Sequence, residues 1–179
     1  MYKGNLVRLR AFEQEDLEAN HQYINDAETA LAMLRGFPLP ASFSDEQQWL
    51  SQQTSYTHGE YQFAIENMDG VMVGRCGLTK IDWKNRSADA GIMIGAPWRG
   101  KGYGTDAMRV LCDFSFRQMN IHHLKVAVLA FNEAAIRCYL RCGFRKEGVL
   151  REDVFRNGRY TDVVLLGILE DEWKPQAQA

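Results

Sequence analysis

The sequence predicts an α/β (α+β) protein in which a mixed sheet carries helices on both of its faces. Three observations lead to this class: short alternating or wholly apolar runs typical of strands, amphipathic stretches typical of helices, and turn dipeptides that separate the two. The predicted order is β-α-α-β-β-β-α-β-α-β-β. Because the chain has 179 residues, we expect one domain over residues 1–173 and a disordered tail over residues 174–179.

Residue periodicity and turn signals define the first half of the chain. Ser44 to Gln47 has the S-x-x-Q spacing of a capping box, which predicts the start of a helix. The dipeptide Asp69-Gly70 predicts the turn of a hairpin. The expected elements are a strand over residues 5–12, a helix over 13–25, a second helix from Ser44 through Leu50, and strands over 61–67, 71–82 and 87–95.

The second half of the chain alternates helices and strands. Residues 124–131 are nearly all apolar, as expected of a central strand covered on both faces. Gly143 suits the position just after a helix, and Asn157-Gly158 is the strongest short hairpin signal in the sequence. The expected elements are a helix from about Thr105 to Met119, a strand over 124–131, a helix from Glu133 to Cys142, and two strands over 151–169.

Composition excludes several classes of protein. Apolar residues make up 46% and charged residues 25%, which is ordinary for a globular domain, and a net charge of -2 leaves no global basic field to attract nucleic acid. The first ten residues lack the apolar core of a secretion signal, and no run of about 20 apolar residues exists, so we expect a cytoplasmic protein without a membrane span.

The cysteines are expected to be reduced thiols that bind no metal. Cys138 and Cys142 share a helix face, with His122-His123 upstream, but the spacing matches no standard zinc pattern. All four cysteines stand in apolar or helical contexts: Cys76, Cys112, Cys138 and Cys142.

The segment from Ile92 to Thr105 carries the clearest chemistry. A strand is followed by Arg99-Gly100-Lys101-Gly102-Tyr103-Gly104 and then by a helix. Glycines let the backbone approach a ligand, and the N–H groups that open a helix attract anions, so the segment predicts a phosphate-binding loop. It is neither a Walker A loop nor a dinucleotide fingerprint, because its glycines follow G-x-G-x-G. The alternative is a surface turn in which Arg99 and Lys101 only add solubility.

Two motifs in this sequence resemble those of the GNAT superfamily of N-acetyltransferases. The segment from Arg99 to Gly104 matches R/Q-x-x-G-x-G/A, and Asn132, Ala135, Tyr139 and Gly143-Phe144 match N-x-x-A-x-x-x-Y-x-x-x-G-F. The likeness covers nearly the whole chain and is closest to the ribosomal-protein (RimJ/RimL-like) and spermidine acetyltransferase branch. It implies a central, mostly antiparallel sheet splayed at a cleft for the cosubstrate acetyl-CoA.

The resemblance also implies which residues bind the coenzyme. Backbone N–H groups from Gly100 to Thr105 would bind the pyrophosphate, a bulge in the preceding strand would splay it, and the pantetheine arm would pair with the exposed backbone of that strand. A backbone N–H of the same strand would bind the oxyanion. Asn132 would contact the coenzyme arm, cap the following helix, or do both. The expected coenzyme-binding residues are Ile92, Met93, Ile94, Arg99, Gly100, Lys101, Gly102, Tyr103, Gly104, Thr105 and Asn132.

Tyr139 is the expected general acid. A tyrosine with a pKa near 10 can protonate a leaving thiolate without losing its own proton beforehand. The alternative from spacing alone is a core aromatic residue at i+3 from Ile136.

Asp89 is the expected general base, acting directly or through water. Alternation places it on one strand face with Gly91 and Met93, where related enzymes often carry a glutamate. The alternative is a carboxylate paired with Arg75 or Lys80, and Glu133 and Glu152 are weaker candidates for the base.

The acetyl acceptor is less defined by the sequence. Carboxylates over residues 13–28 could attract a polyamine or a basic peptide N-terminus, but they also suit a solvated helix face, and residues 35–43, with Arg35, Phe37 and Phe43, suggest a pocket loop. We expect transfer to a primary amine, either a protein N-terminus or a polyamine-like small molecule. The alternatives are an antibiotic or amino-sugar acetyltransferase and a non-catalytic acyl-CoA-binding module. A homodimer is consistent with the family likeness.

Overall fold

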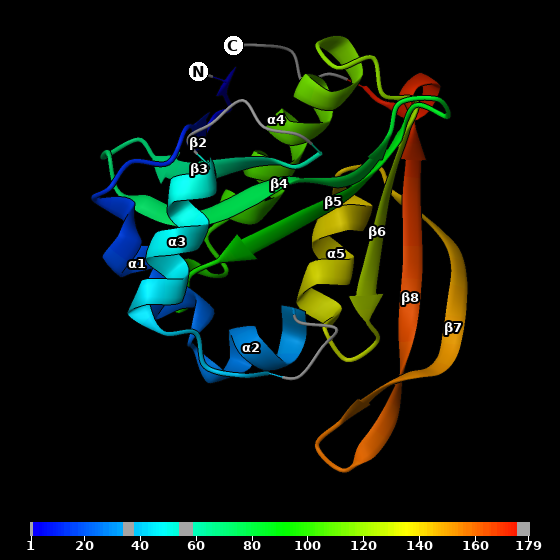
Figure 1. Ribbon diagram of the computed structural model, residues 1–179. Coiled ribbons are helices and arrows are strands. Elements are labelled where there is room, and N and C mark those ends of the chain that lie inside the picture. Colours follow the sequence, from blue (N-terminus) through cyan, green and yellow to red (C-terminus); the bar gives the residue numbers. More distant parts are fainter. Residues whose placement is uncertain (1, 34–37, 54–58, 175–179) are drawn as a thin grey trace.

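The computed structural model describes residues 2–33, 38–53 and 59–174. Eight strands form one sheet in the order β1-β2-β3-β4-β5-β6-β8-β7, and every neighbouring pair is antiparallel except β5 and β6 (Figure 1). The strands are β1 (Tyr2–Lys3), β2 (Val7–Arg10), β3 (Tyr61–Asn67), β4 (Met72–Asp82), β5 (Ser87–Ile94), β6 (His123–Leu129), β7 (Arg145–Arg156) and β8 (Arg159–Leu169). The mixed sheet confirms the predicted fold class.

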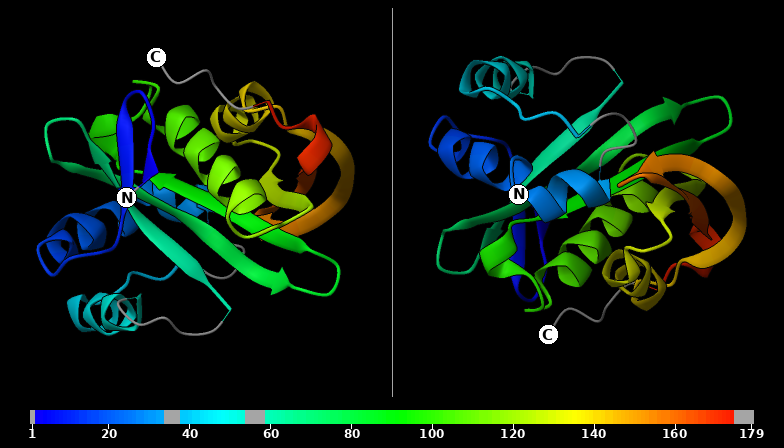
Figure 2. Two further views of the ribbon diagram at one scale, coloured as in Figure 1. Left: turned by 90° about the horizontal axis from the view of Figure 1, so that it is seen from above. Right: turned by 90° about the horizontal axis from the view of Figure 1, so that it is seen from below.

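Helices cover both faces of the sheet, as predicted (Figure 2). The α-helices are α1 (Asp16–Ile24), α2 (Ala27–Met33), α3 (Phe43–Gln53), α4 (Tyr103–Arg117) and α5 (Glu133–Arg141), and the short 3₁₀ helices are η1 (Ala96–Trp98) and η2 (Glu170–Glu172). Within the described ranges, no helix combines the length and apolar character needed to cross a membrane.

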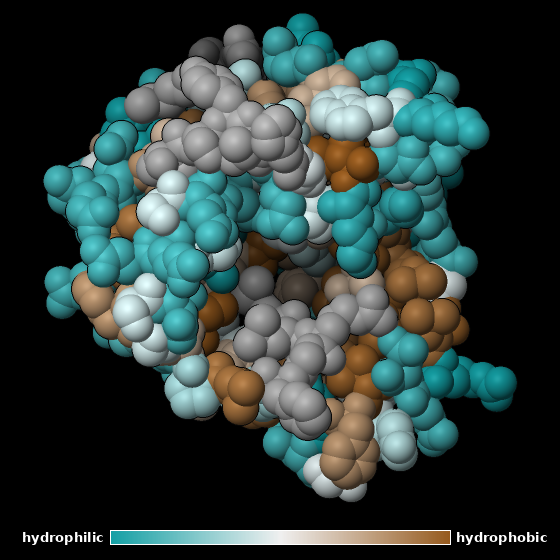
Figure 3. All heavy atoms as spheres, in the orientation of Figure 1, coloured by the Kyte–Doolittle hydropathy of each residue, from teal (hydrophilic) through white to brown (hydrophobic). Residues whose placement is uncertain are grey.

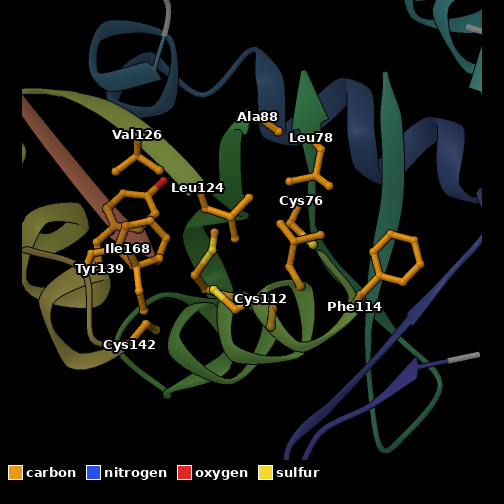
Figure 4. Close-up of a cluster of buried hydrophobic side chains, with 14 of the residues drawn as sticks. Cys76, Leu78, Ala88, Cys112, Phe114, Leu124, Val126, Tyr139, Cys142 and Ile168 are labelled. Carbon is orange, nitrogen blue, oxygen red and sulfur yellow. The ribbon is translucent and has the colours of Figure 1, made fainter. Parts of the chain in front are cut away.

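The main core lies between one face of the sheet and the helices α4 and α5 that cover it (Figure 4). The amphipathic stripe of α4 places Met108, Leu111 and Cys112 against Leu78 of β4 and Leu124 of β6. These side chains are almost fully excluded from solvent, so this face contributes most of the apolar burial.

A smaller apolar cluster fixes α1 and α3 on the opposite face. Leu17 of α1 and Leu50 of α3 pack on Ala64 and Met72 of the central strands. A further small cluster joins Tyr23 of α1 to the end of β5. The two helical layers are therefore held to the same strands from opposite sides.

Both predicted hairpins are present. Residues 61–67 form β3 as expected, and Gly70 has φ 81° in the turn before β4. Asn157 and Gly158 have φ values of 50° and 77° between the paired residues Arg156 and Arg159. Two positive φ values are the signature of a two-residue type I′ turn.

Apart from shifts of up to three residues at the ends of elements, four local predictions differ from the structure, one being that β7 begins at Arg145 rather than at residue 151. The two-residue strand β1 and the helix α2 were not expected. The capping box of α3 is formed by Ser42 and Asp45 rather than by Ser44 and Gln47: the Ser42 hydroxyl accepts from the Asp45 N–H at 3.1 Å, and the Asp45 carboxylate accepts from the Ser42 N–H at 3.1 Å. The helix consequently begins at Phe43.

A buried carboxylate on α4 fixes the N-terminal segment. Asp106 accepts backbone hydrogen bonds from Asn5 at 3.2 Å, Leu6 at 2.7 Å and Val7 at 3.1 Å. Gly4 lets the N-terminal backbone approach Asp106 closely, because a Cβ at this position would lie 2.4 Å from an Asp106 carboxylate oxygen. One carboxyl side chain thus holds the start of β2 on the first turn of α4.

We predict that Asp106→Ala lowers the free energy of unfolding by about 3 kcal/mol, since it strands three N–H donors that a charged acceptor now satisfies. Asp113→Ala on the same helix is the matched control, because its pair with Arg117 is solvent-exposed and such pairs contribute less than about 1 kcal/mol. Urea denaturation of both variants measures the difference. Equal losses would contradict an anchoring role for Asp106.

Candidate functional site

The site begins where two parallel strands separate. β5 and β6 pair only from Ser87 to Asp89 and from His123 to Lys125. Beyond that point β5 stays on β4 and β6 stays on β8, so the two strands diverge (Figure 1). The face that contains this divergence is hollowed near its middle (Figure 3). The splayed sheet implied by the family resemblance is therefore present.

The expected bulge lies in a different strand. β5 keeps a continuous register with β4 from Asp89 to Ile94, and the register shift falls between Thr79 and Asp82. β4 uses three steps there against two in β5, so the extra residue belongs to β4, where Lys80 has φ 47°. The divergence of β5 from β6 accordingly needs no irregularity in β5.

A cavity of about 360 Å³ occupies the space beside the end of β5. Four segments build it: the end of β5, the segment from Trp98 through the glycine loop to the first turn of α4, one side of α5 with its N-cap, and α2. Its lining is Glu28, Thr29, Ala32, Ile92, Met93, Ile94, Trp98, Arg99, Gly100, Gly102, Tyr103, Gly104, Thr105, Asn132, Ala134, Ala135, Arg137, Cys138 and Arg141. Every residue predicted to bind the coenzyme lies in this set except Lys101.

The glycine loop presents backbone N–H groups to the cavity. Gly100 and Gly102 have φ values of 75° and 88°, which only glycine adopts readily. Gly102 is the N-cap of α4 and gives no side-chain cap, and the Asp106 N–H is bonded to the Gly102 carbonyl at 3.1 Å. The preceding N–H groups of the first turn have no partner within the helix, so this is a ready anion site.

Of the two basic residues of the loop, Arg99 lines the cavity and Lys101 does not, and both contact other side chains. The Lys101 Nζ lies 4.8 Å from the centroid of the Trp98 ring. The Arg99 guanidinium contacts α2 and its N-cap, with 2.8 Å to an Asp26 carboxylate oxygen, 2.6 Å to Glu28, and a contact to the Thr29 hydroxyl. The positive charge beside the loop comes instead from Arg137 and Arg141 of α5, which line the cavity.

Asn132 has the capping role expected of it and lies where the other expected role, contact with the coenzyme arm, would need it. Its side chain caps α5, with the Oδ1 accepting from the Ala135 N–H at 3.1 Å, and it also lines the cavity.

Tyr139 lies on α5 but inside the core. Its ring packs against Phe144, with 5.4 Å between centroids, and its side chain is drawn beside Val126 and Ile168 in Figure 4. Burial raises the pKa of Tyr139 above its ordinary range, since the phenolate would lose its hydration. The residue is outside the cavity lining and keeps its proton at neutral pH.

Asp89 occupies the strand face that alternation predicts. Met93 packs with Tyr23 of α1, whereas Ala88 belongs to the core on the α4 side, so Asp89 shares the α1 side with Met93. Its Oδ2 accepts from the Lys80 Nζ at 2.9 Å, with 31% of the Asp89 side chain and 73% of the Lys80 side chain exposed. The alternative interpretation, pairing with Lys80, thus describes the contact found.

Neither of the weaker candidates for the base lines the cavity, and neither does Asp89. Glu133 forms an exposed pair with Arg137 at 2.9 Å. Glu152 has φ 51°, and its backbone N–H donates to Asp162 at 2.8 Å. The suggested pocket residues Arg35 and Phe37 lie outside the described residues, and Phe43 is exposed with its ring 5.4 Å from that of His21.

Cys138 is a cavity residue that the sequence interpretation did not single out for this role. Its sulfur accepts a hydrogen bond from the Thr105 hydroxyl at 3.6 Å. The neighbouring Cys142, the hydrogen bond from Thr105, and the charges of Arg141 and Arg109 lower the pKa of Cys138 below its usual range against the effect of burial. The i,i+4 spacing of the two cysteines was the available signal.

Comparisons with known proteins agree with this geometry. Residues 7–145 match the family described as "Acetyltransferase (GNAT) domain". The chain is 32% identical to the spermidine N(1)-acetyltransferase of Vibrio cholerae serotype O1 over 167 residues, which cover 93% of this chain and 95% of that protein. It is 31% identical to the corresponding Escherichia coli K12 enzyme over 173 residues, or 97% and 91% of the two chains.

A solved relative extends the comparison to three dimensions. The Vibrio cholerae spermidine N-acetyltransferase in complex with CoA and spermine superimposes with a TM-score of 0.83 at 30% identity, covering 93% of this chain and 96% of that one. The glycine loop, the splayed strands and these matches lead to one conclusion. The chain is an N-acetyltransferase of the GNAT family and uses acetyl-CoA as its cosubstrate.

Proposed function

We propose that this enzyme transfers the acetyl group of acetyl-CoA to a primary amine of a polyamine-like small molecule. The observation that carries the proposal is the nearly full-length similarity to spermidine N(1)-acetyltransferases, at 32% identity over 93% of the chain. The acceptor of those relatives is a flexible cation. A second observation supports the proposal, namely that this chain has a cavity at the divergence of β5 and β6.

The coenzyme pyrophosphate is assigned to the first turn of α4. The backbone N–H groups from Gly102 to Thr105 lie on the cavity and lack acceptors within the helix. Several N–H donors and a helix dipole favour two closely spaced negative charges. Arg137 and Arg141 on the facing helix supply the compensating charge.

The pantetheine arm is assigned to the free edge of β5. From Ala90 onward this strand has no pairing with β6, and Ile92, Met93 and Ile94 line the cavity. An extended amide-bearing arm can pair with such an edge in the manner of an added strand. A backbone N–H of this stretch is then placed to stabilise the oxyanion of the tetrahedral intermediate.

Acetyl transfer proceeds in this proposal by direct attack. The amine nitrogen forms a bond to the thioester carbon, the carbon–sulfur bond breaks, and the thiolate takes a proton from the Tyr139 hydroxyl. The support for Tyr139 in this role is its place in the N-x-x-A-x-x-x-Y-x-x-x-G-F motif, since burial keeps its hydroxyl protonated but also makes it a weaker acid. The nitrogen loses its remaining surplus proton as the amide forms, and that proton, passed through water, restores the Tyr139 hydroxyl.

The amine loses its surplus proton to Asp89 through water. Lys80 engages the Oδ2 of this carboxylate, so Oδ1 is the oxygen assigned to the proton. Asp89 is the last residue of β5 that pairs with β6. In this proposal a water relay spans the distance from its carboxylate to the acceptor nitrogen.

An amine panel tests the choice of acceptor. We predict that thiol release from acetyl-CoA with spermidine has a kcat/KM at least about tenfold above that with a peptide N-terminus or an amino sugar. A faster reaction with the peptide or the amino sugar would contradict the polyamine proposal. Thiol release no faster than hydrolysis with every amine would contradict catalysis itself.

The general acid is tested by Tyr139→Phe. We predict a loss in kcat of about 100-fold, since proton transfer by a positioned side chain contributes at least that much, with coenzyme affinity nearly unchanged. Phe144→Leu is the control, because it disturbs the same ring contact without removing a proton donor. If Tyr139→Phe instead loses coenzyme affinity and keeps its kcat, the residue is structural.

The phosphate site is tested at Gly104. A Cβ there would lie 3.4 Å from Ile94 and 3.7 Å from the Cys138 sulfur, so alanine fits, whereas the larger side chain of valine enters the cavity. We predict that Gly104→Val weakens coenzyme binding by about 100-fold or more, measured calorimetrically, because the diphosphate loses several charge-assisted hydrogen bonds. Gly104→Ala should lose less. Gly102→Val is a poorer test, since its φ of 88° would strain any side chain.

A further inference from the structure

α2 forms part of the coenzyme cavity although little apolar packing holds it there. Glu28, Thr29 and Ala32 of this helix line the cavity. Among residues 27–32 only Thr29 is buried, and none of the six belongs to a buried apolar cluster of the described chain. The position of this wall therefore depends on polar contacts.

The N-terminus of α2 is bound by Arg99 of the coenzyme loop. The Arg99 Nη2 donates to the Asp26 Oδ1 at 2.8 Å and to the Thr29 hydroxyl, and its Nη1 donates to Glu28 at 2.6 Å. The Nε donates to the Ile94 carbonyl at 3.3 Å, so the same guanidinium also holds the end of β5. A planar guanidinium with all three nitrogens engaged has a fixed geometry.

Asp26 is the partner that matters most. Its Oδ1 also accepts from the Thr29 N–H at 2.9 Å and from the Thr29 hydroxyl at 2.8 Å, which makes it the N-cap of α2. The hydrogen bonds from Thr29 and the charge of Arg99 lower the pKa of Asp26. Glu28 is 82% exposed against 31% for Asp26, so its ion pair contributes little.

A second arginine holds the other end of the helix. The Arg156 Nε, which is buried at the end of β7, donates to the Leu31 carbonyl at 3.4 Å. A cation at this end also suits the helix dipole. α2 thus lies between an arginine of the coenzyme loop and an arginine of the β7–β8 hairpin.

We propose that Arg99 is a positioning residue: it holds α2 as a wall of the coenzyme cavity through Asp26 and does not neutralise the coenzyme pyrophosphate. Four of the five N–H groups of the side chain are already engaged, by two carboxylates, a hydroxyl and a carbonyl, which leaves one for a diphosphate. Turning toward a diphosphate would release the N-terminus of α2 and leave Asp26 without its ion-pair partner.

The two possible roles of Arg99 give opposite results for Asp26→Asn. Asparagine is as good an N-cap as aspartate, so this variant keeps the helix start and removes the ion pair. If Arg99 positions α2, coenzyme binding weakens, and we expect about a tenfold rise in the dissociation constant as the wall loosens. If Arg99 binds the pyrophosphate, the same change frees the guanidinium and removes a nearby negative charge, so binding tightens.

The experiment measures binding of coenzyme A by calorimetry without any amine, so its outcome is independent of the proposed acceptor. Arg99→Ala should match Asp26→Asn, the double variant should bind no more weakly than Arg99→Ala, and Arg99→Lys should recover part of the loss.

Hydrogen exchange at residues 27–33 should quicken in both single variants, and the KM for acetyl-CoA should rise while kcat is nearly kept. Arg117→Ala, which breaks an exposed pair on α4, is the control. Tighter binding by Asp26→Asn, wild-type binding by both single variants, or additive losses would each overturn the proposal.

Discussion

The site exists because β5 and β6 pair as parallel strands over only three residues each, from Ser87 to Asp89 and from His123 to Lys125. Both strands keep their outer partners to their ends, so the sheet remains whole on either side while a gap opens at its centre. α4 follows β5 and α5 follows β6. The separation of the strands therefore places the start of one helix and the flank of the other around a single space, and it leaves the backbone edge of β5 free for a ligand.

The elements that the sequence predicts well are those whose signal is local. The residues over 61–67 have a strand pattern that is visible within that segment alone. Asn157-Gly158 adopts two positive φ values that few other dipeptides tolerate. β1 has only two residues, too few for any alternation to register. The capping box of α3 was placed two residues too late, because Ser42 and Asp45 offer the same chemistry as Ser44 and Gln47. A sequence pattern cannot decide between two serines this close together.

The sequence predicts the backbone conformation of the site better than it predicts the partners of its charged side chains. The glycine spacing identifies the loop that reaches the cavity, since conformation is a property of a few consecutive residues. The destination of Arg99 depends on Asp26 and Glu28, more than 70 positions away, and nothing local announces that pairing. For the same reason α2 was not expected: residues 27–32 of this helix bury little apolar surface, and long-range hydrogen bonds determine its place. Asp89 shows the intermediate case, in which alternation gave the correct face and two candidate partners.

The thiol of Cys138 has a consequence for chemical biology. Most of the cavity surface is backbone, aliphatic carbon and arginine, yet one ionisable sulfur stands among them. Cys76, Cys112 and Cys142 are buried. Burial raises the pKa of the first two, and the neighbouring Cys138 together with burial raises that of Cys142, so none of the three competes for an electrophile. A weakly reactive compound shaped for this space would bond covalently at one atom of the protein. Selectivity over acetyltransferases that lack a cysteine here would come from that bond rather than from differences in shape.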